Sequence, residues 1–202
     1  MKTRFKCRPG KARLAVQVAA DALWRLNNGK LSTRARDSSV WGYVVLLRNS
    51  ATVNHTLVDT KQQVAHCQVC ALGAMFVARA LQSDKDWNRC LNSRCHGDLT
   101  ATSRSKIDAE LRDIFYPGTL DQIERAYELW AGWAEDAIDS KRRACSYHLL
   151  DPRDRLKVIL RNIIANHGDF VINPSEYNEI TVKLHRGKVK VVRKALKQKA
   201  VR

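Results

Sequence analysis

The spacing of apolar residues along the chain predicts a set of buried helices. The first is expected over residues 11–28, where Leu14, Val18 and Leu26 fall on one face at helical spacing. It should end at Asn27-Asn28-Gly29, because asparagine and glycine are common at helix C-termini. This segment is therefore the first helix of the predicted core.

The most apolar stretch runs from His66 to Ala78, and we interpret it as the central helix of the fold. Leu72, Met75 and the small residues between them leave almost no polar face, which is typical of a buried helix. Gly73 lies inside this stretch, where glycine costs about 1 kcal/mol relative to alanine. We expect another backbone to pack closely against Gly73.

Two helices separated by Pro117-Gly118 are predicted in the stretch from residue 107 to residue 139. The first is short and covers residues 107–115. Thr119 is predicted to be the N-cap of the second, with Gln122 completing a capping box, and this helix should run to the end of the stretch.

The last core helix is predicted to begin at Asp151 and to end at Gly168. Asp151 is a favourable N-cap, and Pro152 would occupy the first helical position. Five large apolar residues recur on one face of this helix: Leu156, Ile159, Leu160, Ile163 and Ile164.

Strand patterns are short and concentrated near the C-terminus. Residues 40–47 fit a strand or a helical turn, and their β-branched residues favour the strand. Residues 170–172 form a second strand-like run. From Glu179 onward, apolar and basic residues alternate around Arg186-Gly187, which predicts a basic hairpin, although the last fifteen residues also fit a helix.

These patterns predict a mainly α fold: a compact helical domain with a small C-terminal β element and basic termini. Residues 1–10 would form a basic N-terminal arm, residues 11–172 the helical core domain, and residues 173–202 a basic C-terminal hairpin or helix extension. Within the core, residues 30–39 and 82–106 are polar, and we expect loops or irregular structure there.

The net charge of +16 is concentrated at the two ends of the chain. Residues 1–36 contain ten Lys and Arg and one acid, and residues 183–202 contain nine Lys and Arg and no acid. The stretch between them is close to neutral. A basic end can be a solvated tail, but this asymmetry favours a polyanion partner, namely nucleic acid or a nucleoprotein complex. The candidate contacts are Arg4, Lys6, Arg8, Lys11, Arg13, Lys183, Arg186, Lys188, Lys190, Arg193, Lys194, Lys197 and Lys199.

The sequence gives no reason to expect a membrane protein or an exported one. No apolar run reaches the roughly 18 residues that a transmembrane helix requires. The basic N-terminus lacks the apolar segment of a signal peptide. We therefore expect a cytoplasmic protein with free thiols among its six cysteines.

Cysteine and histidine spacing leaves a metal site open. Cys67 and Cys70 form one close pair, and Cys90, Cys95 and His96 form a second group, which is the type of ligand set that tetrahedral zinc prefers. The alternative is that these are ordinary buried or loop thiols, because cysteine is often buried in its own right. We expect no cofactor, with structural zinc as the alternative.

The candidate nucleophile is Cys70, because the thiolate of Cys67 or Cys70 would be stabilised if that cysteine lay at a helix N-terminus. No histidine is placed beside it by the sequence. Phosphate-binding glycine loops, His-Glu-x-x-His and Gly-x-Ser-x-Gly are all absent from the chain. We therefore favour a binding protein over an enzyme.

The segments Val18-Ala19-Ala20-Asp21-Ala22-Leu23, Cys70-Ala71-Leu72-Gly73-Ala74-Met75, 115–128 and 155–170 resemble small uncharacterised phage and prophage proteins that share a Cys-Ala-Leu-Gly-Ala helix. The resemblance implies a mobile-element origin and a helical core, and it transfers no activity. It makes the host cell cytoplasm the expected location.

The sequence thus favours a non-enzymatic, phage-encoded binding protein that acts on nucleic acid or a host nucleoprotein machine, in host takeover or counter-defence. The alternatives are a cysteine-dependent enzyme centred on Cys70 and a structural particle component that neutralises packaged nucleic acid.

Overall fold

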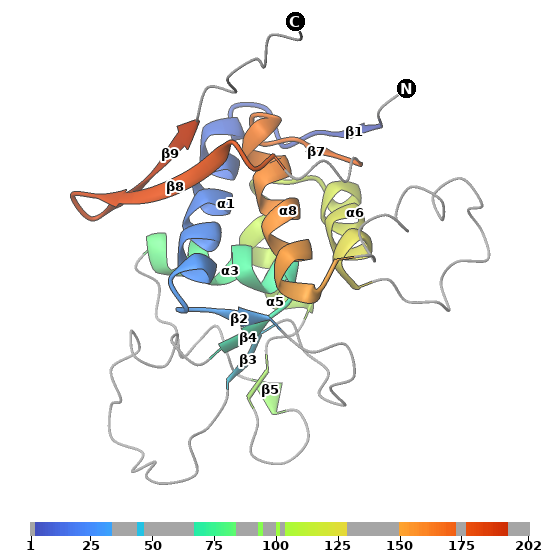
Figure 1. Cartoon of the computed structure of the whole chain (residues 1–202). Coiled ribbons are helices and arrows are strands. Elements are labelled where there is room, and N and C mark those ends of the chain that lie inside the picture. The colour runs from blue at the N-terminus through green and yellow to red at the C-terminus, as the bar shows by residue number, and fades with distance from the viewer. Residues whose placement is uncertain are drawn as a thin grey trace, which may run out of the picture.

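The fold, seen here in a computed structural model, is mainly α, and the described residues also form three small β-sheets (Figure 1). The structure describes residues 3–33, 44–46, 67–83, 93–94, 100–101, 104–128, 150–172 and 177–193.

Three helices form the centre of the molecule: α1 (Ala12–Asn27), α3 (Ala71–Gln82) and α8 (Pro152–Ala165). Helices α1 and α8 lie side by side, and α3 contacts both of them (Figure 1). Residues 71–78 of α3 are all buried, which confirms the prediction of a buried central helix. The first and last core helices are likewise confirmed.

The central helix begins later than the sequence pattern predicted. Residues Cys67–Val69 form strand β4, and Cys70 has an extended backbone with φ −88° and ψ −173°. The Cys70 sulfur then accepts a hydrogen bond from the Gly73 N–H at 3.4 Å, so Cys70 is the N-cap. The boundary was misplaced because Cys67–Val69 alternates apolar, polar and apolar residues over only three positions, too few to separate a strand from the first turn of a helix.

The region after α3 contains α5 (Arg104–Leu111) and α6 (Pro117–Glu128). Pro117 begins α6, where its missing N–H costs nothing. Thr119 lies in the first turn of α6 and is not its N-cap, so that prediction was wrong. Its hydroxyl instead donates to the Lys6 carbonyl at 2.7 Å and fixes the N-terminal segment. The predicted continuation to Asp139 lies outside the described residues.

Helix α8 begins and ends as predicted. The Asp151 carboxylate accepts hydrogen bonds from the backbone N–H groups of Arg153 and Asp154, at 2.8 and 3.1 Å. At the other end, the Gly168 N–H donates to the Ile163 carbonyl at 2.8 Å, which closes a Schellman turn.

Gly168 also brings α8 close to α1. With φ +99°, a Cβ built on it would lie 2.9 Å from the Ala12 carbonyl oxygen and 3.0 Å from the Ala15 Cβ. Glycine is therefore required at this contact for conformational and for steric reasons.

The largest sheet has five short strands in the order β2-β4-β3-β6-β5. Strand β3 (Val44–Leu46) confirms the strand predicted within residues 40–47. Strands β2 (Ser32–Thr33), β5 (Ser93–Arg94) and β6 (Thr100–Ala101) fall in segments predicted as loops. Two-residue polar strands carry no alternation, so the sequence pattern could not reveal them.

The N-terminal segment is held against the end of α8. Strand β1 (Arg4–Phe5) pairs with β7 (Phe170–Val171) in antiparallel fashion. The Asn162 side chain binds the other edge of β7, donating to the Val171 carbonyl at 2.7 Å and accepting from its N–H at 3.0 Å. A side chain of α8 thus substitutes for a neighbouring strand.

Candidate nucleic-acid interface

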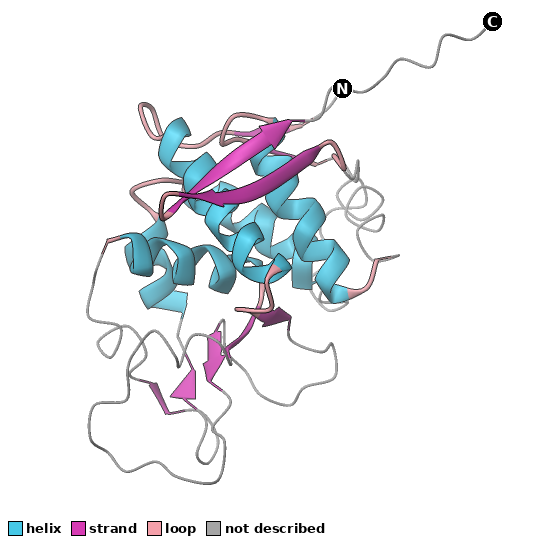
Figure 2. Cartoon of the chain, turned by 60° about the vertical axis from the view of Figure 1, so that its left-hand side comes forward, coloured by secondary structure: helices cyan, strands magenta, loops and turns pink. Residues whose placement is uncertain are grey.

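The C-terminal hairpin, β8 (Ile180–His185) and β9 (Lys188–Arg193), carries most of the described C-terminal candidates. Figure 2 shows this two-stranded ribbon lying across the helices, and both strands contact α1. The basic hairpin predicted from the sequence is confirmed for these residues. Lys194, Lys197 and Lys199 lie outside the described residues.

The register of the hairpin divides its side chains between two faces. In an antiparallel pair, residues directly opposite each other point to the same face. Val182 lies opposite Val191 and Leu184 opposite Val189, and these residues form the inner face. The valines are partly buried against the core, so this face attaches the ribbon to the body.

The other face, which we call the outer face, consists of the pairs Thr181–Val192, Lys183–Lys190 and His185–Lys188. The three lysines and His185 are exposed. Two lysines that face each other directly repel, because opposed Cβ atoms are only about 5 Å apart. Among the described residues, no acidic side chain forms an ion pair with any of these lysines. The outer face is therefore a concentrated positive surface that no described acidic side chain neutralises.

The two strands are joined by a two-residue turn made of Arg186 and Gly187. Both have positive φ, +49° and +73°, which is the geometry of a type I′ turn. Arg186 is exposed at the tip and has no ion-pair partner within the described part of the chain.

Arg193 has a different position from the other hairpin cations. It lies opposite Ile180, on the inner face. Its guanidinium donates to the Ile164 carbonyl at 3.5 Å, near the C-terminus of α8. A cation is favourable there because of the helix dipole, so Arg193 has a structural partner already.

Several N-terminal candidates also have partners inside the protein. Arg4 lies 3.4 Å from the Asp169 carboxylate, and Lys11 lies 3.7 Å from that of Asp113. Arg8 donates to the Arg112 carbonyl and its guanidinium lies over the Tyr116 ring, 4.9 Å from the centroid.

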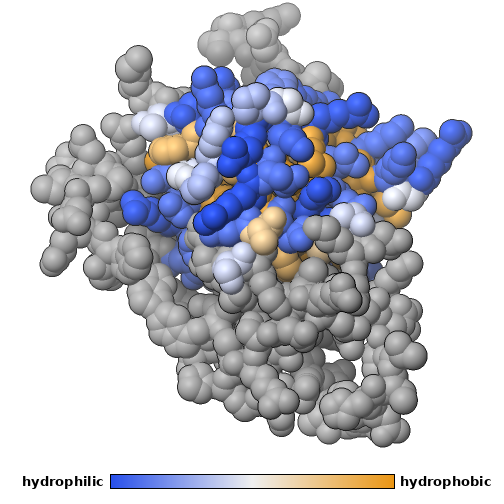
Figure 3. Space-filling model, turned by 180° about the vertical axis from the view of Figure 1, so that it is seen from behind, coloured by the Kyte–Doolittle hydropathy of each residue, from blue (hydrophilic) through white to orange (hydrophobic). Residues whose placement is uncertain are grey.

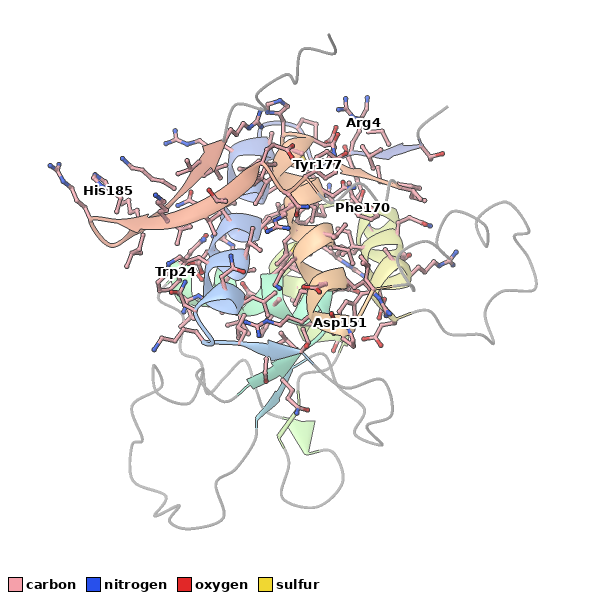
Figure 4. The ribbon with its side chains drawn as sticks, viewed as in Figure 1. Arg4, Trp24, Asp151, Phe170, Tyr177 and His185 are labelled. Atoms are coloured by element: carbon pink, nitrogen blue, oxygen red, sulfur yellow. The ribbon has the colours of Figure 1, made fainter. Side chains whose placement is uncertain are left out.

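Lys6 and Arg13 are exposed and make no ion pair with the described residues. Figure 4 shows Arg4 and His185 at opposite sides of the molecule. The structure therefore does not gather all the candidate cations into one surface: the hairpin forms one group, whereas Arg4, Arg8 and Lys11 have partners inside the protein.

His185 was missed by the sequence analysis as a member of this surface. Its position follows from the turn, because a two-residue loop at Arg186-Gly187 places residues 185 and 188 directly opposite each other. Reading the hairpin register from that turn would have identified it.

Cys70 is poorly suited to nucleophilic chemistry. Its side chain is 1% exposed, and burial raises the pKa of the thiol well above its ordinary value, with the carboxylate of Glu128 adding to the effect. A buried neutral thiol is a weak nucleophile because the thiolate is the reactive species. The hydrogen bond that the Gly73 N–H donates to the Cys70 sulfur is explained by capping of helix α3.

The predicted zinc site stays a prediction, because most of its ligands lie outside the described residues. Cys67 lies in β4, whereas Cys90, Cys95 and His96 lie outside the described residues. Within the described ranges, no group of three or more His, Cys, Asp or Glu side chains could hold a metal ion. Cys7 is half-buried, and burial together with a hydrogen bond to Asp169 raises the pKa of its thiol.

Comparison of the chain with protein families, with curated proteins and with solved structures gave no match. None of the helices in the described part of the chain combines the length and the apolar character that a membrane crossing requires.

Proposed function

We propose that this protein is a non-enzymatic nucleic-acid-binding protein whose outer hairpin face binds the phosphate backbone. The observation that carries the proposal is the Lys183–Lys190 pair, two like charges directly opposite each other with no described acidic partner. This arrangement is destabilising in isolation and becomes favourable when phosphates lie between the cations.

The surrounding residues support the same ligand. Lys188 and His185 extend the positive face toward the tip, and Arg186 adds a fifth donor there. The cationic residues occupy every second position of each strand, 183 and 185 in β8 and 188 and 190 in β9. Neighbouring cations on one strand therefore lie about 7 Å apart. That distance is close to the spacing of successive phosphates in a nucleic acid strand.

The biological setting that we propose, a phage or prophage protein acting in host takeover or counter-defence, is supported by the resemblance to small phage proteins. The hairpin supplies the binding surface in that proposal. The resemblance contributes no enzymatic activity to this proposal.

The decisive experiment measures affinity against salt concentration, by fluorescence anisotropy with a labelled oligonucleotide. Contacts from Lys183 and Lys190 would neutralise about two phosphates, which contributes about −1.4 to −1.8 to the slope of log affinity against log salt. The double variant K183Q/K190Q should reduce the slope by about 1.4 to 1.8 and weaken binding at low salt.

A matched control removes two exposed positive charges elsewhere. Lys30 follows the end of α1 and Arg125 lies in α6, so K30Q/R125Q has the same net charge as the hairpin double variant. It should retain nearly all of the salt slope. If the two double variants weaken binding equally, net charge rather than the hairpin explains the affinity. If the native protein binds no DNA or RNA at micromolar concentration in about 50 mM salt, the proposal is wrong.

A further inference from the structure

The tip of the hairpin projects from the body of the protein. Exposure rises along both strands: residues 180–182 and 191–192 are buried or half-buried, whereas residues 183–188 are all exposed. Figure 1 shows the turn extending past α1, and in Figure 3 hydrophilic residues cover the projecting end. Figure 4 shows His185 at this tip, on the side away from the helices.

The turn residue Arg186 departs from what the turn itself favours. A type I′ turn needs positive φ at both central positions, and Asn-Gly is the preferred pair. Arginine at φ +49° is an uncommon choice for a residue with a long side chain. Departures from local preference concentrate at functional positions, which makes the Arg186 guanidinium a candidate contact group.

An apolar side chain accompanies this guanidinium. Leu184 is 51% exposed, one of two large hydrophobic side chains that are exposed in the described structure. It precedes His185 and lies on the inner face, beyond the valines that contact the core. Residues 184–188 therefore present the planar guanidinium of Arg186, the polar or cationic side chains of His185 and Lys188, and one apolar side chain, Leu184.

The major groove of double-stranded DNA fits this set of groups. It is about 12 Å wide and admits a two-stranded ribbon, whose strands lie about 4.8 Å apart. Its floor offers guanine O6 and N7 to an arginine fork and the thymine methyl group to an apolar side chain. The major groove of an RNA duplex is deep and narrow, so the same ribbon could not enter it.

We propose that residues 184–188 enter the major groove of double-stranded DNA, while Lys183 and Lys190 contact the phosphates at the groove edge. This inference rests on the proposed function and names its ligand class. It distinguishes a base-contacting tip from a backbone-contacting stem within one hairpin.

The test compares two single-charge variants on three ligands. Arg186→Asn removes the guanidinium and installs the preferred turn pair, so the hairpin should remain folded. Lys190→Gln removes one charge from the stem and serves as the matched control. The ligands are a 20-base-pair DNA duplex, one of its strands alone, and an RNA duplex of the same sequence.

We expect the native protein to bind the DNA duplex at least about tenfold more tightly than the RNA duplex. Arg186→Asn should weaken DNA-duplex binding about tenfold, as the loss of one good base contact does, and should change single-strand binding by about twofold or less. Lys190→Gln should weaken binding to all three ligands by a similar factor. In the native complex, guanine N7 in the bound duplex should be protected from methylation by dimethyl sulfate.

Three results would overturn the inference: equal affinity for DNA and RNA duplexes, unchanged DNA-duplex affinity in Arg186→Asn, or unprotected guanine N7. If the salt slope still depends on Lys183 and Lys190 in those cases, the proposed function stands and only the groove assignment fails. If none of the three ligands binds, both proposals fall.

Discussion

Replacing Lys190 by glutamate should make the protein more stable and a weaker binder at the same time. Lys190 lies directly opposite Lys183, and both side chains are exposed. The substitution removes one like-charge repulsion and creates one attraction, each worth a few tenths of a kcal/mol between exposed cross-strand residues. The free energy of unfolding should therefore rise by about 0.5 kcal/mol, equivalent to an increase of about 1–2 °C in melting temperature.

The matched variant K190Q isolates the two effects. It removes the repulsion without adding an attraction, so its stability should fall between those of the native protein and K190E. Thermal unfolding at about 20 mM and 500 mM salt measures the electrostatic share, because the advantage of K190E should shrink when salt screens the pair. Hydrogen exchange at the hairpin amides gives the same comparison locally.

The affinity of K190E for nucleic acid should fall, whereas its free energy of unfolding rises. K190E loses one phosphate contact and adds a negative charge to the outer face, so its affinity for an oligonucleotide should fall by more than that of K190Q. The reasoning would be refuted if K190E were less stable than the native protein at low salt, if its advantage were independent of salt, or if it bound nucleic acid as tightly as the native chain.

Three further predictions concern the core. Gly168→Ala should cost about 2–4 kcal/mol in denaturant unfolding, because its Cβ would meet the α1 backbone and the residue has positive φ; a cost below about 1 kcal/mol contradicts the close contact. Asn162→Ala should cost about 3 kcal/mol, since it leaves the N–H and C=O of Val171, which is 4% exposed, without these partners; rapid hydrogen exchange at Val171 is the local check. Burial raises the pKa of Asp21 despite its ion pair with Arg25 at 2.7 Å. Its stabilising contribution is therefore present at low pH and lost as the pH rises through the folded pKa, so the stability of the native protein relative to Asp21→Asn should fall as the pH rises above about 4, the ordinary pKa of aspartate, and a rise would contradict this.

The helices were predictable from the sequence because each one carries its own local signals. The Asp151 N-cap, the Asn-Gly stop after α1 and the regular apolar spacing of α8 act within a few residues, and each was confirmed. The start of α3 was misplaced because Cys67–Val69, an apolar–polar–apolar triplet, is too short to show the period of a strand. Burial alone does not distinguish strand from helix over three residues.

The sequence predicted which residues belong to the candidate site, but it did not predict how they are arranged in space. The sequence identified the basic hairpin, but the opposition of Lys183 and Lys190 depends on strand register. The partners of Arg4 and Lys11, namely Asp169 and Asp113, are far away in sequence. Only the tertiary fold shows that these two cations are already engaged, and local pattern contains no information about such contacts.

The pairing of β1 with β7 affects the order in which the chain can fold during synthesis. The Cys7 N–H donates to the Asp169 carboxylate across 162 positions in the sequence, and strand β1 has its described partner only in residues 170–171. At about 5–20 residues per second, a ribosome needs on the order of ten seconds to add the intervening chain. Strand β1 therefore cannot pair with β7 until α8 and the residues after it have been synthesised. The docking of β1 is a late, long-range step that follows assembly of the helices.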